Sequence, residues 1–182
     1  MKRFISIFFL TVILSGCATP ADQTAMSLES TERGNYSAQS NLAGEVAVGS
    51  VIGGEKTNPA WTSEIGSEQF RRALENSLET AYLLGPRLNS KYLVDVELVG
   101  INQPMVGFSF NVSSRIRYTV REQNSRELVL DELVSADGRA GAGEAFVGTK
   151  RLQIATEKSA KNNIRNFIDR ILEFAAKSST ED

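Results

Sequence analysis

The sequence predicts an α+β fold: a two-layer sandwich in which two amphipathic helices cover one face of a mostly antiparallel four-stranded sheet. Two helical stripes of apolar residues and several stretches of alternating apolar and polar residues support this prediction. Amphipathic helices need an apolar surface to cover, and a sheet with one apolar face provides it. The expected element order is βαβββα, within one domain extending over residues 42–177.

The first strand and the first helix are expected before residue 90. The strand extends from Glu45 to Ile52, where Val46 and Val48 alternate with smaller residues, and Gly53 and Gly54 end it. The helix is expected from Ser63 to Leu84 and stops at Gly85 and Pro86. Its apolar stripe recurs every four residues: Phe70, Leu74, Leu78 and Tyr82.

Three further strands and a second helix complete the domain. Strands are expected over residues 92–101, 108–121 and 128–134, the last two joined by a hairpin turn at residues 123–125. A glycine-rich loop over residues 137–143 should follow, and then a helix over 149–176. The third strand alternates most cleanly, which predicts one buried and one open face. Its buried face should carry Phe108, Phe110, Val112, Ser114, Ile116, Tyr118 and Val120.

The first 17 residues are typical of an export signal. A basic start, Met1 to Arg3, precedes an apolar run from Phe4 to Leu14 that is too short to span a bilayer of about 30 Å. Leu14-Ser15-Gly16-Cys17 resembles the bacterial lipobox, in which the cysteine takes up a diacylglycerol group. Residues 1–16 are therefore interpreted as a lipoprotein signal peptide. Cys17, the only cysteine, is the expected lipidation site, and no disulfide can form within one chain.

Residues 17–41 are interpreted as the lipidated cysteine followed by a flexible tether. The segment is rich in Ser, Thr, Ala, Asn and Glu, and such a composition buries too little apolar surface to fold alone. The resemblance to bacterial lipoproteins implies an outer-membrane location facing the periplasm, because Ala18 and Thr19, and no aspartate, follow the cysteine. Residues 178–182 are expected to form a disordered tail.

The composition favours binding over catalysis, so we expect no enzyme activity, metal or cofactor. The chain has no histidine, the commonest general base and metal ligand, and its one thiol is assigned to lipid. Removal of Lys2 and Arg3 leaves 18 basic and 22 acidic side chains, a net charge of −4, which excludes an electrostatic footprint for nucleic acid. Asp95 and Glu97 share a strand face and are expected to be solvated charges. The glycine-rich stretch 49–57 carries Glu55 where a phosphate loop would not, and is interpreted as an ordinary loop.

Two groups of side chains are candidates for binding. Arg115, Arg117 and Arg121 share the open face of the third strand, where they would form a cationic strip for an acidic protein surface or an anionic envelope polymer. The second group consists of apolar residues at predicted loops and element ends, where such side chains often anchor partners or else close the core. Its members are Trp61, Pro104, Met105, Phe108 and Phe146.

The layout of lipobox, polar segment and single βαβββα domain resembles the YajG-like outer-membrane lipoproteins. It is also similar, more coarsely, to the lipoprotein component of lipopolysaccharide assembly and to domains of the curli secretion lipoprotein. Residues 58–61, 103–108 and 145–151 are similar to stretches of uncharacterised lipoproteins. The resemblance implies a membrane-anchored, non-catalytic binding or scaffolding module of the cell envelope. A carrier of a small apolar or lipid ligand, and an enzyme using Ser, Lys or carboxylate groups, are the alternatives.

Overall fold

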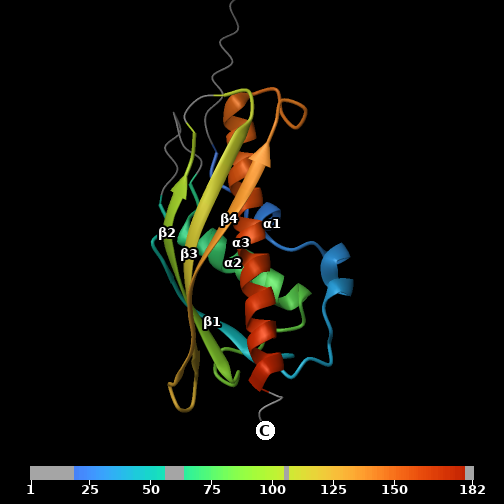
Figure 1. Ribbon diagram of the computed structural model, residues 1–182, viewed down its shortest axis with the longest axis vertical. Coiled ribbons are helices and arrows are strands. Elements are labelled where there is room, and N and C mark those ends of the chain that lie inside the picture. The colour runs from blue at the N-terminus through green and yellow to red at the C-terminus, as the bar shows by residue number, and fades with distance from the viewer. Residues whose placement is uncertain (1–18, 56–63, 105–106, 179–182) are drawn as a thin grey trace, which may run out of the picture.

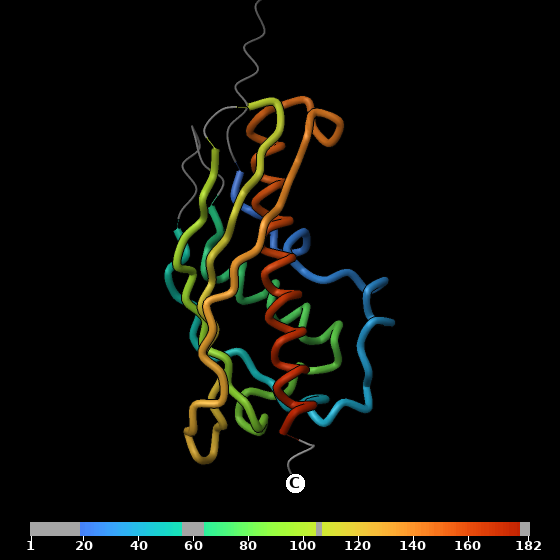
Figure 2. The backbone as a smooth tube through the Cα atoms, in the orientation of Figure 1, coloured from blue at the N-terminus to red at the C-terminus, as the bar shows by residue number. Residues whose placement is uncertain are grey.

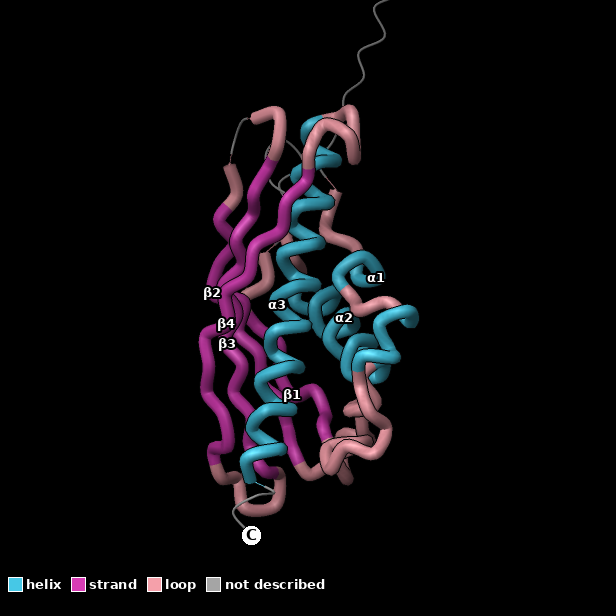
Figure 3. Tube along the Cα trace, turned by 45° about the vertical axis from the view of Figure 1, so that its right-hand side comes forward, coloured by secondary structure: helices cyan, strands magenta, loops and turns pink. Residues whose placement is uncertain are grey.

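A computed structural model of the chain describes residues 19–55, 64–104 and 107–178 and confirms the predicted α+β architecture (Figure 1). A four-stranded sheet is covered on one face by α2 and α3, and the elements from β1 onward follow the order βαβββα (Figure 3). The elements are α1 (Gln23–Met26), η1 (Ser30–Asn35), β1 (Val46–Ile52), α2 (Ser67–Thr80), β2 (Tyr92–Asn102), β3 (Phe110–Glu122), β4 (Leu128–Ala140) and α3 (Gly148–Ser178).

The strands lie in the order β1-β2-β3-β4. β1 pairs with β2 in parallel, with Val48 opposite Val94, because the crossover through α2 returns the chain in the same direction. The other two pairings are antiparallel, and Tyr118 of β3 lies between Val96 of β2 and Glu132 of β4. β3 and β4, at 13 residues each, are the longest strands of the described sheet.

The core lies between the sheet and its two helices. The rings of Tyr118 on β3 and Phe167 on α3 stack in parallel at 4.1 Å between centroids, and both residues are fully buried. Alternate residues of β3 face this core, as the sequence predicts, although the strand begins at Phe110 and Phe108 lies outside it. Other fully buried side chains come from both helices: Phe70, Leu74, Leu78, Ile164 and Ile168.

A buried polar network fixes how α3 lies on the sheet. The Tyr118 hydroxyl donates to Asn163 Oδ1 at 3.0 Å, and Asn163 Nδ2 donates to the Val134 carbonyl at 2.9 Å and to Ser114 Oγ at 3.2 Å. Leaving such groups unpaired in a core costs about 1–3 kcal/mol each. The network therefore favours the one position of α3 in which every partner is met.

The glycine-rich loop predicted over residues 137–143 is partly wrong, because β4 continues to Ala140. Gly138 lies inside the strand, directly beneath α3. A Cβ atom at Gly138 would come within 2.1 Å of the Ala155 carbonyl oxygen and 2.2 Å of the Ser159 nitrogen. This glycine thus serves close packing of helix and strand, a use that composition alone does not distinguish from a loop. The first helix is also shorter than predicted and begins at Ser67, not Ser63.

The flexible tether predicted over residues 17–41 is wrong for its described part. Residues 19–41, here called the strap, lie over the helices on the side away from the sheet (Figures 1 and 3). Met26 is fully buried, and Ala21 and Leu28 are almost so. Asp22 caps α1 by accepting hydrogen bonds from the Thr24 and Ala25 nitrogens. A few apolar side chains are enough here, because the helices already supply the rest of the core. The folded unit therefore includes residues 19–41 and does not begin at residue 42.

Within the described part of the chain, no helix combines the length and the apolarity needed to cross a membrane.

Candidate functional site

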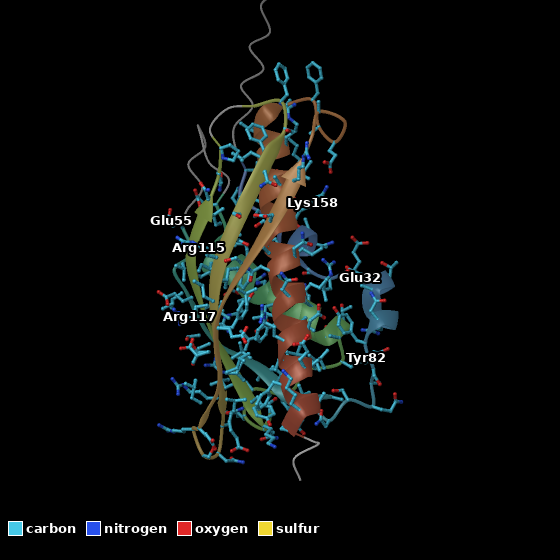
Figure 4. All side chains as sticks on the ribbon, in the orientation of Figure 1. Glu32, Glu55, Tyr82, Arg115, Arg117 and Lys158 are labelled. Carbon is cyan, nitrogen blue, oxygen red and sulfur yellow. The ribbon has the colours of Figure 1, made fainter. Side chains whose placement is uncertain are left out.

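The uncovered face of the sheet is the main candidate site. β3 places Arg115, Arg117 and Arg121 on this face, because its buried residues alternate with them. Figure 4 shows Arg115 and Arg117 along the sheet, with Glu32 beyond the helices on the other side. All three arginines therefore lie on one face, as predicted, but each of them has different neighbours.

Arg117 is paired within the protein. Its Nη1 lies 3.0 Å from Asp131 Oδ1 on β4, and Glu97 of β2 is its neighbour in the strand register. Its charge is therefore balanced locally, and the cationic strip expected from the sequence is interrupted at its centre. Because the pair is solvent-exposed, its contribution to stability is small.

Arg115 borders an open depression of about 530 Å³ near one end of the face. Gly100 and Asn102 of β2 line it on one side and Ser135 of β4 on the other. Within the described ranges, Arg115 forms no ion pair. The lining thus combines one guanidinium group with neutral polar side chains, which suits a carboxylate, sulfate or phosphate group.

Arg121 borders a second depression of about 470 Å³ near the turn between β3 and β4. Arg126 contributes a second cation to the lining, beside Leu93, and Glu122 contributes one carboxylate, so the lining carries two cations and one anion. Gln123 fixes this region by donating to the Arg87 and Ser90 carbonyls at 2.9 and 2.8 Å. The face therefore carries two separate basic depressions and not a continuous strip.

Asp95, which the sequence places beside Glu97 on this face, is engaged in holding β1. Its Oδ1 accepts hydrogen bonds from the Ser50 nitrogen at 2.7 Å and the Ser50 hydroxyl at 2.6 Å, where the register of β1 and β2 shifts. This carboxylate therefore supports an irregular edge strand. In the ranges that the structure describes, no three acidic side chains gather as a metal site requires.

The second candidate group, the loop aromatics, is only partly described. Trp61 and Met105 lie outside the described residues, as does Cys17. Phe146 and Phe108 are 98% and 92% exposed, so neither closes the core. Phe146 lies in the loop before α3, and Phe108 lies in the loop before β3. Both loops are next to the start of α3.

A ladder of polar contacts joins the strap to α3 and was not predicted from the sequence. Four side chains of α3, spaced four residues apart, contact successive residues of the strap. The two segments therefore run in the same direction (Figure 2). The pairs are Thr19 with Gln153, the Asp22 nitrogen with Glu157, Glu29 with Lys161, and Glu32 with Arg165. Two features of the sequence could have indicated these contacts: polar residues spaced by four along α3, and acidic residues in the strap. Burial under the strap raises the pKa of Glu157, and hydrogen bonds from Asp22 and Gln153 offset only part of this effect.

The fold and this surface define a small α+β protein in which the described helices cover one face of the sheet. No family model and no curated protein sequence matches the chain. Three solved structures are similar in fold: a DUF330 protein from Xanthomonas campestris (TM-score 0.55, 10% identity, 75% of this chain and 88% of that chain), a hypothetical protein from Chlamydia trachomatis (0.53, 11%, 71% and 96%), and a candidate lipoprotein from Caulobacter crescentus (0.50, 10%, 79% and 96%). At these identities the likeness concerns the fold alone.

Proposed function

We propose that this chain is a lipid-anchored lipoprotein of the cell envelope that binds an anionic protein surface or envelope polymer through the uncovered face of its sheet. The observation that carries this proposal is the presence of two depressions, at Arg115 and Arg121, on a face that no helix of the described residues covers. The role is one of binding or scaffolding and not of catalysis.

The separation of the two depressions indicates the size of the ligand. Arg121 is six positions after Arg115 on β3, which corresponds to about 20 Å along a strand. A single small anion cannot reach both, whereas an extended polymer or an acidic protein surface can. The alternative of a lipid carrier is less well supported, because stacked rings and aliphatic side chains fill the layer between α3 and the sheet.

The anchor is supported by two independent features. Leu14-Ser15-Gly16-Cys17 has the lipobox pattern, and a candidate lipoprotein is among the proteins of similar fold. An outer-membrane location facing the periplasm follows from the residues after Cys17, by resemblance to other lipoproteins. Attachment by lipid also needs no basic patch on the protein.

The docking face can be tested with Arg115→Gln and Arg121→Gln combined. Hydrogen bonds to charged groups contribute about 1.5–3 kcal/mol each, so affinity for a polyanion such as dextran sulfate should fall roughly tenfold or more. Binding of the unaltered protein should also weaken as salt rises. Affinity at two salt concentrations is the measurement.

Arg170→Gln is the matched control, because Arg170 is an exposed arginine that pairs with Glu132 and lies on α3. This variant should bind as the unaltered protein does. Equal binding by the double variant and by the control would show that the sheet face is not the docking surface.

The anchor can be tested with Cys17→Ser, which replaces the sulfur that accepts the diacylglycerol. The variant should remain uncleaved or leave the outer-membrane fraction. Mass spectrometry of the N-terminal peptide and membrane fractionation measure the two effects. An unchanged cleavage site together with unchanged membrane association would contradict the lipoprotein assignment.

A further inference from the structure

The path of the strap limits how far the folded domain can lie from the proposed lipid. Thr19 Oγ1 donates to Gln153 Oε1 at 2.6 Å, and Gln153 Nε2 donates to the Pro20 carbonyl at 3.0 Å. Gln153 is five residues after the start of α3, about 8 Å along the helix axis. Cys17 precedes Thr19 by two residues, a reach of at most about 7 Å. A lipid on Cys17 is therefore held close to the end of the molecule where α3 begins.

The same end exposes large apolar side chains, here called the apolar tip (Phe108, Phe146 and Val147). Phe108 and Phe146 are almost fully exposed and Val147 is 47% exposed. An aromatic or aliphatic side chain left in water forgoes the favourable free energy of apolar burial. Two phenylalanines exposed at one end of a domain indicate a surface that is covered in use.

The backbone beneath the apolar tip is well supported. Arg151 donates to the Phe146 and Ala145 carbonyls at 2.8 and 3.0 Å, and its guanidinium lies 5.8 Å from the centre of the Phe110 ring. Phe110 in turn pairs with Ala140 across β3 and β4. The loop that carries Phe146 is thus connected through Arg151 to Phe110, at the start of the strand that follows Phe108.

Charged side chains of both signs lie near this end of the molecule, where the Glu144 carboxylate is already paired with Lys158. Arg139, at the end of β4, and Lys150, in the first turn of α3, are both exposed. Lysine and arginine near a membrane surface are attracted to anionic lipid headgroups. Exposed aromatics with basic neighbours are a combination that suits the interface of a phospholipid bilayer.

We propose that the apolar tip is a membrane-docking surface that inserts Phe108 and Phe146 into the bilayer interface beside the lipid on Cys17. This inference rests on the proposed lipid anchor and adds an orientation to it. α3 then begins at the membrane surface, and the uncovered sheet face points along the membrane, where a partner can reach it.

The test uses the mature lipidated protein in vesicles of phosphatidylethanolamine and phosphatidylglycerol. Trp61, the only tryptophan, is replaced by phenylalanine, and a single probe is introduced as Phe108→Trp, Phe146→Trp or Leu88→Trp. Leu88 is the matched control because it is also 92% exposed and lies at the opposite end, where the neighbouring Arg87 carbonyl accepts from Gln123. Lipids brominated on their acyl chains then quench only probes that enter the bilayer.

Emission from the Phe108→Trp and Phe146→Trp probes should fall at least about twofold, since interfacial side chains reach about 5–10 Å into the boundary. Emission from the Leu88→Trp probe should stay unchanged. If the protein carries lipid and floats with the vesicles but all three probes respond alike, the docking surface is overturned and the anchor stands. Tip probes shielded from acrylamide but not quenched by bromine would indicate a second copy on the tip, which also overturns it. A protein that carries no lipid on Cys17 overturns the anchor and this inference together.

Discussion

Replacement of Phe167 with alanine is expected to lower the free energy of unfolding by about 3–5 kcal/mol. The ring is fully buried and stacks on Tyr118 at the centre of the layer between α3 and the sheet, so its removal leaves a cavity that neighbouring side chains cannot fill. Urea unfolding followed by circular dichroism measures the loss.

Arg117→Ala is the control for this substitution, because it lies on the same sheet but on the open face. Loss of its exposed ion pair with Asp131 should change stability by about 0.5 kcal/mol or less. If Arg117→Ala proved more destabilising than Phe167→Ala, the assignment of the buried and open faces would be reversed, as a shift of one residue in strand register would cause.

Replacement of Met26 with alanine should destabilise the protein by about 2–5 kcal/mol. Met26 is fully buried with Leu28 in the main core cluster, so its side chain contributes to the fold as a core residue does. If residues 19–41 were a tether, the same substitution would have no measurable effect. Urea unfolding of the variant distinguishes the two cases.

Thr24→Ala is the matched control, since Thr24 is an exposed residue of the same short helix. It should change stability by no more than about 0.5 kcal/mol. A Met26→Ala variant as stable as this control would show that the strap does not pack on the helices in solution.

Much of the fold could be predicted because the periodicity of apolar residues indicates which side chains are buried. The alternation along β3 and the stripe on α3 each repeat over many residues, so the pattern of contacts is present in the sequence itself. The strap and the end of β4 could not be predicted in this way. Met26 and Leu28 are isolated apolar residues in a polar segment, and Gly138 has its role only because α3 lies on it.

The candidate site was predicted in outline only. Placing Arg115, Arg117 and Arg121 on one face follows from the period of a strand. Their differing surroundings depend on which residues of β2 and β4 become neighbours, and pairing with Asp131 separates Arg117 from the other two. Sequence spacing within one strand contains no information about such cross-strand partners.

The strap also determines the order in which the molecule can fold. Its contacts with α3 join residues that are 132 to 135 positions apart, among the longest loops that the chain can close. Contacts so distant in sequence form slowly and late. Because chains are synthesised from the N-terminus, the strap can pack on α2, where the Leu28 nitrogen donates to the Ser77 hydroxyl, before α3 is made, but its ladder to α3 forms only once the last helix is present. Until α3 is made, Glu29 and Glu32 of the strap lack their partners, so the complete core closes only when the last helix docks.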